Sequence, residues 1–222
     1  MAVTGNVVVY TAIFGSYDTL RDPIGLEKDV TYHCFTDITP PSDGIWQMHY
    51  QELEQRSNVR AARYRKIMAH KFLPDADYSM WIDGNIQLIN PRTRAKCFSY
   101  LGDADIALFK HAERDCVVQE AAANIVLGKD FPSNIHRQIQ HYFNKGYLEH
   151  NGMVETNILL RRHTKSVQEF NEAWWDELEQ HTHRDQLSFN YVAWKLGMRY
   201  NTFGGGVPRL GQCNWARYYS HG

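Results

Sequence analysis

Hydrophobic and polar positions along the chain fall into short blocks that predict strands and helices in alternation. Apolar, β-branched or aromatic blocks bounded by turn residues are typical of buried strands, and they occupy residues 7–14, 31–36, 46–50, 78–82, 86–89, 106–109 and 154–160. Apolar positions spaced by three and four residues predict helices at residues 57–73, 116–127, 135–143, 166–178 and 185–196. This alternation predicts an α/β fold, with a mixed, mainly parallel sheet flanked by helices.

The helix predicted at residues 57–73 has Ser57 as a plausible N-cap and carries two kinds of side chain on neighbouring faces. An apolar stripe should face the core: Ala61, Tyr64, Met68 and Phe72. At 100° per residue, a basic edge lies beside it: Arg56, Arg60, Arg63, Lys66 and His70. Such an edge fits a solvated helix face as well as a phosphate-binding surface.

Two later helices carry end signals. Ser166 and Glu169 form a capping box, which predicts a helix start at Ser166, and a buried stripe follows: Val167, Phe170, Trp174 and Leu178. The helix at residues 185–196 should stop at Gly197. We find no linker or internal repeat, so residues 1–222 are expected to form one domain.

Composition narrows the class of protein. The chain has 222 residues, of which 43% are hydrophobic and 22% charged, as in folded globular proteins. Its formal charge of -1 argues against a surface committed wholly to nucleic acid or anionic lipid, although the part after Asp185 has no acidic residue. The phosphate-binding patterns G-x-G-x-x-G and G-x-x-x-x-G-K-[ST] are absent from the sequence, which disfavours Rossmann and P-loop functions.

The four cysteines and the N-terminal residues bear on location. The cysteines form no C-x-x-C pair, and we expect them to be reduced. No apolar run reaches the ~18 to 20 residues of a membrane span, and residues 1–5 lack the pattern of a signal peptide. A cytoplasmic protein is therefore expected.

The segment Trp81-Ile82-Asp83-Gly84-Asn85 is the most informative in the sequence. It places a carboxylate and an amide oxygen two residues apart at a strand break, which suits Mg²⁺ or Mn²⁺ completed by diphosphate oxygens and water. Gly84 lets the backbone approach phosphates closely. The alternative is a tight hairpin turn, for which the same residues are favoured. Apolar residues on both sides favour the metal, because a hairpin tip would project into water.

Further polar groups fall near expected strand and helix ends. Arg63 and Lys66 of the basic edge are candidates to pair with Asp83 or to bind the donor diphosphate. Glu155 and Asn157 lead into a strand and are candidates to meet sugar hydroxyls or act in catalysis, the alternative being a simple capped turn.

Arg184 and Asp185 begin a predicted helix. Asp185 would cap that helix, or act as a general base or a stabiliser of positive charge at the anomeric carbon, with Arg184 keeping it ionised. His221 lies in an aromatic tail and is a candidate nitrogen ligand for the cation; a frayed terminus is the alternative.

Together these motifs resemble a glycosyltransferase family that was long catalogued as a domain of unknown function and includes plant pectin galacturonosyltransferases. The resemblance spans nearly the whole chain. Its motifs are residues 9–18, Cys34-Phe-Thr-Asp37, Arg60-x-x-Arg63-x-x-Lys66, Trp81-Ile-Asp-Gly-Asn85, Glu155-Thr-Asn157 and Arg184-Asp-Gln186-x-Ser188.

The resemblance implies a GT-A-like fold that transfers a hexosyl or pentosyl residue from a nucleotide-diphosphate sugar. Asp83-Gly84-Asn85 stands where such enzymes carry an Asp-x-Asp metal motif, with a neutral third position. The resemblance also places three residues of the first loop near the nucleotide, Asn157 near the donor sugar and Asp185 near the reacting carbon. The three loop residues are Thr11, Ala12 and Tyr17.

The sequence does not identify the molecule that would accept the sugar. Plant members of the family work behind a membrane anchor, and the lack of an anchor or stem in this sequence suggests a bacterial or viral origin. Two alternatives to a carbohydrate-modifying enzyme are a non-catalytic nucleotide-sugar-binding module and a transferase that acts on modified DNA. The DNA alternative rests on the basic C-terminal segment, whose cations are Lys195, Arg199, Arg209 and Arg217.

Overall fold

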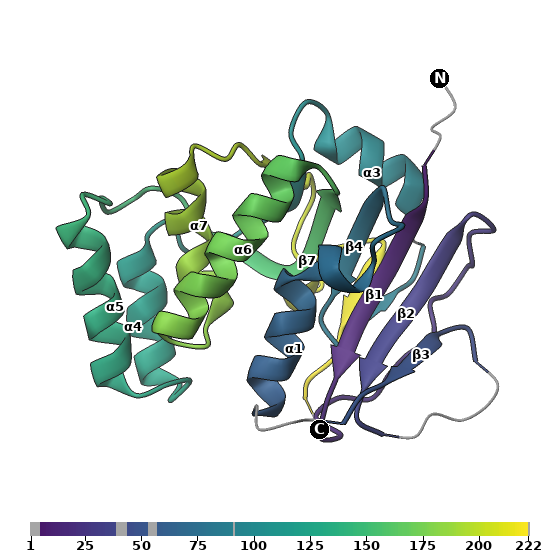
Figure 1. Cartoon of the computed structure of the whole chain (residues 1–222), viewed down its shortest axis with the longest axis horizontal. Helices are drawn as coiled ribbons and strands as arrows, with labels where there is room; N and C mark the ends of the chain where they lie inside the picture. Colours follow the sequence, from purple (N-terminus) through teal and green to yellow (C-terminus); the bar gives the residue numbers. More distant parts are fainter. Residues whose placement is uncertain (1–4, 39–43, 53–56, 91, 222) are drawn as a thin grey trace.

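A computed structural model describes residues 5–38, 44–52, 57–90 and 92–221 (Figure 1). Its main sheet has seven strands in the order β3-β2-β1-β4-β7-β6-β8. All pairings are parallel except those of β7 with β4 and β6, so the mainly parallel sheet predicted from the sequence is confirmed. The strands are β1 (Val7–Ile13), β2 (Val30–Thr36), β3 (Gln47–Tyr50), β4 (Tyr78–Ile82), β6 (Ile106–Lys110), β7 (Val154–Arg162) and β8 (Asn201–Thr202).

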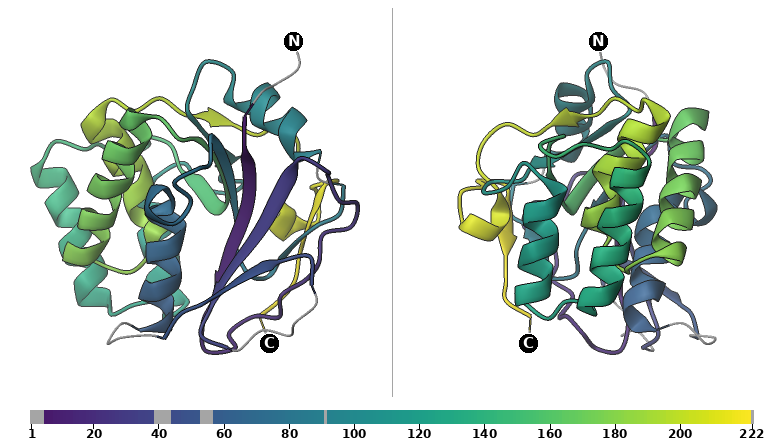
Figure 2. Two further views of the ribbon diagram at one scale, coloured as in Figure 1. Left: turned by 45° about the vertical axis from the view of Figure 1, so that its right-hand side comes forward. Right: turned by 90° about the vertical axis from the view of Figure 1, so that its left-hand side faces the viewer.

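One face of this sheet is covered by helices, which lie together on the same side of the strands in Figures 1 and 2. Val8, Tyr10 and Ala12 of β1 pack into this layer. The helices are α1 (Asn58–Ile67), α2 (Ala69–Phe72), α4 (Val117–Val126), α5 (Pro132–Asn144), α6 (Lys165–Gln180) and α7 (Asp185–Leu196). None of the described helices is long and apolar enough to span a membrane.

The opposite face packs against α3 (Thr93–Leu101), the C-terminal segment and a small sheet. Val7 and Val9 of β1 point to this side, because side chains alternate along a strand. The small sheet pairs β5 (Ile86–Leu88) with β9 (Ala216–Tyr218), and a 3₁₀ helix, Pro208–Leu210, precedes β9. Strands buried on both faces explain the continuous apolar run of β1.

The structure confirms one helix end predicted from the sequence and corrects others. Ser57 caps α1 by accepting a hydrogen bond from the Arg60 backbone N–H (3.3 Å), as expected. The single helix predicted at residues 57–73 is instead two, because the chain turns out of helical geometry at Met68. The start predicted at Ser166 is also wrong. Thr164 is the N-cap of α6, and its hydroxyl accepts from the Val167 N–H.

The hairpin alternative for residues 83–85 is wrong as well. β5 does not pair with β4; it crosses to the small sheet and pairs with β9. The aromatic tail therefore folds back against the Asp-Gly-Asn segment, where the Tyr219 N–H donates to the Asn85 carbonyl (3.0 Å). The Asn85 amide in turn donates to the Tyr219 carbonyl (2.8 Å). The polar tripeptide thus sits where the large sheet, the small sheet and the tail meet.

Candidate active site

Asp83 directly follows β4, at the edge of the sheet where parallel strands end. Because β7 runs the opposite way, its first residues reach the same edge, and the Asp83 N–H donates to the Asn157 carbonyl (2.9 Å). The Oδ1 atom of Asp83 accepts from the Trp81 indole N–H (2.7 Å) and from Lys66 Nζ (3.3 Å). Arg63 Nη1 lies 3.8 Å from the same oxygen. The predicted pairing of Asp83 with the basic edge of α1 is confirmed.

Asp185 forms the second anionic half of this cluster. Its Oδ2 lies 2.6 Å from Lys66 Nζ, and its Oδ1 lies 3.0 Å from Arg63 Nε. The Thr156 hydroxyl donates to Asp185 Oδ2 (2.9 Å) and accepts from Lys66 Nζ (3.1 Å). Thr156 was not identified from the sequence, although it stands between Glu155 and Asn157. The signal that could have found it is the alternation of side chains along a strand, which places Thr156 on the face covered by helices.

The electrostatics of Asp185 limit its chemistry. Burial alone would raise the pKa of its carboxyl, but Arg63, Lys66 and Arg184 together hold that pKa well below its usual range. A carboxylate so strongly stabilised is a poor proton acceptor. Asp185 therefore suits the orientation of Lys66 and Arg63 better than the general-base role considered from the sequence. Arg184 contributes to its ionisation less than these two cations do.

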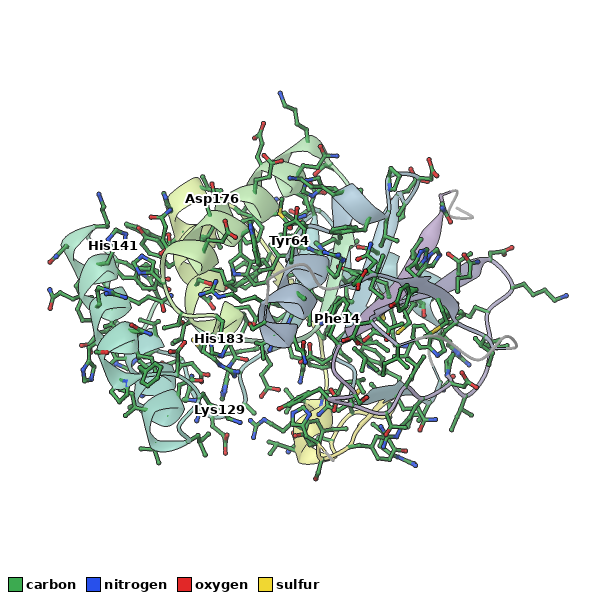
Figure 3. The ribbon with its side chains drawn as sticks, turned by 60° about the horizontal axis from the view of Figure 1, so that its bottom comes forward. Phe14, Tyr64, Lys129, His141, Asp176 and His183 are labelled. Atoms are coloured by element: carbon green, nitrogen blue, oxygen red, sulfur yellow. The ribbon has the colours of Figure 1, made fainter. Side chains whose placement is uncertain are left out.

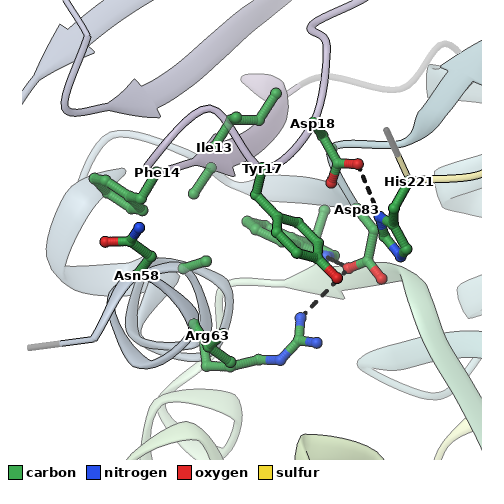
Figure 4. A pocket seen from close by; sticks show the side chains of 13 residues that line it. Ile13, Phe14, Tyr17, Asp18, Asn58, Arg63, Asp83 and His221 are labelled. Carbon is green, nitrogen blue, oxygen red and sulfur yellow. Dashed lines mark hydrogen bonds and ion pairs between the residues drawn. The ribbon is translucent and has the colours of Figure 1, made fainter. Parts of the chain in front are cut away.

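A first cavity opens beside Asp83 and is shown in Figure 4. Its walls are largely apolar, and Arg63, Asp83 and His221 stand at its charged end. Two of the three residues expected near a nucleotide, Ala12 and Tyr17, line it; the remaining described walls include Ile13, Phe14, Asn58, Val59, Ala62 and Trp81. An apolar recess with the Arg63 guanidinium at its charged end, beside the carboxylates Asp18 and Asp83, matches a nucleoside whose phosphates reach a cation site.

Gly84 is required for a tighter contact than the sequence indicated. A Cβ atom at this position would lie 2.8 Å from Ile13 Cγ1 and 3.0 Å from Asp18 Oδ2. Glycine thus lets the segment after β4 pack against the loop after β1. The Asp18 carboxylate also pairs with His221, whose Nδ1 lies 2.8 Å from Asp18 Oδ1. The Tyr17 ring lies 4.8 Å from the His221 ring, centre to centre. The tail is therefore held at the cavity by two residues of one loop.

A second cavity shares Asp83 and His221 with the first and is lined mainly by polar and charged residues. Besides the shared Asp83 and His221, four candidate residues from the sequence line it: Asn85, Glu155, Asn157 and Arg184. Glu155 Oε1 lies 3.0 Å from Arg209 Nη2, and the Asn157 amide donates to Glu155 Oε2 (3.2 Å). Such fixed polar groups suit the binding of sugar hydroxyls.

His111 lines the second cavity and was missed in the sequence, because it lies in the loop after β6 outside any motif. Its Nδ1 accepts from the backbone N–H groups of Glu113 (3.1 Å) and Arg114 (3.0 Å). Burial and the cations Arg114 and Arg209 lower its pKa to about 4, so the ring is neutral at pH 7. With Nδ1 as acceptor, the proton sits on Nε2. His111 is thus a fixed N–H donor of the cavity wall.

The residues around Asp83 fit a hard divalent cation. Asp83, Asn85 and His221 line the second cavity together, and the Oδ1 atom of Asn157 is buried there with no hydrogen-bond partner among the described residues. Around Asp83, the described part of the chain brings no three His, Cys, Asp or Glu ligand atoms within 4.8 Å of one another. An ion here would need oxygens from a ligand and water as well, as Mg²⁺ and Mn²⁺ sites commonly do.

Two predicted residues are not brought into this arrangement. The Arg60 guanidinium donates to the carbonyls of Leu178 (3.1 Å) and His181 (3.3 Å), so it ties α1 to the end of α6. Thr11 is buried in β1 and lines neither cavity as described. Arg56 of the basic edge lies outside the described residues. Arg184 does reach the second cavity, where its Nε atom has no hydrogen-bond partner among the described residues.

Two solved structures share part of this architecture. One is a glycosyltransferase involved in the glycosylation of the major capsid of PBCV-1, with 15% identity, a TM-score of 0.40, and coverage of 71% of this chain and 66% of that one. The other is mouse xyloside xylosyltransferase 1 in its apo form, with 9% identity, a TM-score of 0.48, and coverage of 89% and 84%. The α/β fold expected from the sequence is confirmed by the sheet and its flanking helices, whereas both TM-scores lie below 0.5 and add nothing to it.

Two curated relatives, both from Arabidopsis thaliana, are similar in sequence. The chain is 28% identical to the probable hexosyltransferase MUCI70, over 88% of this chain and 38% of that protein. It is 26% identical to the alkaline ceramidase TOD1, over 84% of this chain and 48% of that protein. It thus spans less than half the length of either relative. The model of the TOD1/MUCI70 glycosyltransferase-like domain matches residues 1–204, and the chain therefore belongs to this family.

Proposed function

We propose that the chain transfers a hexosyl residue from a nucleotide-diphosphate sugar to a carbohydrate acceptor. One observation carries the proposal: an apolar cavity and a polar cavity meet at Asp83 and His221. A nucleotide-diphosphate sugar has the same order of parts, with an aromatic base, a charged diphosphate and a hydroxyl-rich ring. The base would lie against Ala12 and Phe14, the diphosphate at Asp83, and the sugar beside Glu155 and Asn157.

The departing diphosphate is the group that most needs stabilisation. In transfer, the acceptor oxygen bonds to the anomeric carbon, the bond from that carbon to the diphosphate oxygen breaks, and the acceptor proton goes to a base. Arg63, which lies beside Asp83, and Arg184, which lines the polar cavity, supply positive charge for this group. Mg²⁺ or Mn²⁺ held by Asp83, Asn85 and His221 would neutralise further charge on the leaving group.

The base for the acceptor proton is assigned to Glu155 rather than to Asp185. Glu155 lines the polar cavity, whereas Asp185 is held by Arg63 and Lys66 behind Asp83. Arg209 donates to Oε1 of Glu155 and the Asn157 amide donates to Oε2, so both oxygens of the carboxylate are held in place. This arrangement holds the carboxylate at the wall of the polar cavity, where the sugar would lie.

Modified DNA is not proposed as the acceptor. Two cations that suggested it from the sequence are engaged with acidic side chains: Arg199 Nη2 lies 2.8 Å from Asp103, and Arg209 Nη2 lies 3.0 Å from both Glu113 and Glu155. A surface that recognises nucleic acid needs cations available for phosphates. The C-terminal segment therefore gives less support to DNA binding than its composition suggested.

The test is a screen of nucleotide sugars against the purified protein, with and without Mn²⁺, read as thermal stabilisation. A productive donor should raise the melting temperature and release nucleoside diphosphate when an acceptor is added. Asp83→Ala should abolish transfer while circular dichroism stays unchanged, and Asp176→Ala, at an exposed position of α6, is the matched control. Full transfer by Asp83→Ala would refute the site. Hydrolysis of ceramide without sugar transfer would favour the reaction named for the second relative.

A further inference from the structure

Three side chains of metal-ligand type meet where α5 approaches the C-terminal end of α6. They are His141 of α5 and the pair Glu177 and His181, which are one helical turn apart at the end of α6. One ligand atom from each lies within 4.8 Å of the other two. Figure 3 shows His141 at the far end of the helical layer from Phe14, which lines the first cavity. The cluster is therefore separate from the candidate active site.

Two polar atoms of this cluster are buried without hydrogen bonds. The Glu177 side chain is only 5% exposed, and its Oε1 atom accepts no hydrogen bond from the described residues although His181 Nε2 lies 3.2 Å away. His181 Nδ1 is likewise buried and unpartnered within the described ranges. Leaving such atoms unsatisfied is unfavourable, because their lost hydration is not replaced by another partner. A ligand that accepts lone pairs from both side chains would remove this cost.

We propose that His141, Glu177 and His181 bind a transition-metal ion of the zinc class. Two imidazoles and one carboxylate are a common zinc ligand set, with water in the remaining position. Neighbouring groups orient the ligands: Tyr142 hydrogen-bonds to Glu177 and also accepts from the Gln138 amide (2.6 Å). Calcium and magnesium fit less well, because they prefer oxygen ligands.

The ion would fasten α5 to the segment that leads into α7. Thr182 donates to Gln138 Oε1 of α5 (2.7 Å), and Arg60 of α1 donates to the His181 carbonyl (3.3 Å). Only three residues separate His181 from Asp185 of the buried charge cluster. The metal is therefore expected to stabilise the placement of Asp185 while taking no part in sugar transfer.

The experiment uses the full chain after removal of metals with a chelator. Zn²⁺ is titrated against a chromophoric competitor, and Co²⁺ is added separately to record its visible absorption. We expect one tight zinc site per chain and an absorption spectrum typical of four-coordinate Co²⁺. Glu177→Gln and His181→Gln should each weaken this site at least ~10-fold. Asp83→Asn should retain it, which separates this site from the proposed active-site cation.

A second cluster provides the matched control. Cys116, Glu149 and His150 also bring three ligand atoms within 4.8 Å of one another, but Glu149 and His150 are exposed. His150→Gln should leave tight zinc binding unchanged. The proposal is overturned if His150→Gln removes the site, if folded Glu177→Gln and His181→Gln proteins bind Zn²⁺ as tightly as the wild type, or if the wild type binds no Zn²⁺ tightly.

Discussion

Lys66 Nζ lies 2.6 Å from Asp185 Oδ2, and neither side chain is more than 3% exposed. An ion pair this deeply buried adds little net stability while it is intact, because both charges lost their hydration. Removing one partner is costly, since the other charge stays buried. The pair therefore fixes α1 against the start of α7 and holds Arg63 and Lys66 in place beside Asp83.

We expect Asp185→Asn to lower the free energy of unfolding by about 3 to 5 kcal/mol, because it leaves Lys66 and Arg63 with less compensating charge. Urea unfolding at pH 7 measures the effect. Asp176→Asn makes the same chemical change at an exposed position of α6 and should shift stability by less than about 0.5 kcal/mol. Equal effects of the two variants would contradict the buried-pair account.

Gly84→Ala tests the contact between the Asp83 segment and the loop after β1. The added methyl would meet Ile13 Cγ1 at 2.8 Å and Asp18 Oδ2 at 3.0 Å, so we expect a loss of about 1 to 3 kcal/mol. Thermal unfolding measures the loss. Ile13→Ala removes Cγ1, so it should cost less stability in the Gly84→Ala background than in the wild type. If Gly84→Ala is as stable as the wild type, the two segments do not pack as described.

His163 gives a prediction about pH. Burial and the charge of Arg161 lower its pKa to about 3, whereas an unfolded histidine titrates near 6.5. Because the unfolded chain binds the proton first, the stability from neutral His163 is complete above about pH 6.5 and is lost progressively as pH falls towards the folded pKa. Between pH 7 and 5, His163→Gln should therefore lose less stability than the wild type, by about 1 to 2 kcal/mol.

Urea unfolding at pH 7, 6 and 5 measures this difference. Glutamine retains a polar group for the Ser79 hydroxyl, which lies 2.8 Å from His163 Nε2. His136→Gln is the control, because His136 is exposed on α5 and should leave the pH dependence unchanged. Parallel pH profiles for wild type and His163→Gln would show that folding does not lower the pKa of His163.

The strands and most helices could be predicted because their apolar periodicity reflects burial on one face or two. The start of α6 was misplaced because Ser166 and Thr164 are both good caps, and only the fold shows that Ser166 instead contacts Thr164 and Asp105. α3 was missed. Its position is set by packing Leu101 against the far face of the sheet rather than by a strong local pattern.

Part of the candidate active site was also predictable from the pattern of apolar and polar residues. Asp83 and the α1 cations could be grouped because polar residues embedded in apolar strands need partners. Periodicity alone did not show that Lys66 is buried while Arg60 turns to the end of α6, since that depends on which elements cover α1. Asp18 and His111 reach the cavities from loops, which carry no periodic signal. The single-domain organisation and the cytoplasmic location stay predictions.

His221→Gln tests the proposed nitrogen ligand of the active-site cation. The His221 ring lies beside both cavities and is held by Asp18 and Tyr17, so its loss should weaken the cation site and leave the donor cavity formed. We expect the Mn²⁺ concentration for half-maximal transfer to rise at least ~10-fold, with activity regained at high Mn²⁺. Titration of Mn²⁺ against initial rate measures this shift, and His136→Gln should leave it unchanged. An unaltered Mn²⁺ dependence in His221→Gln would remove His221 from the ligand set and leave Asp83 and Asn85 as the protein's share of the site.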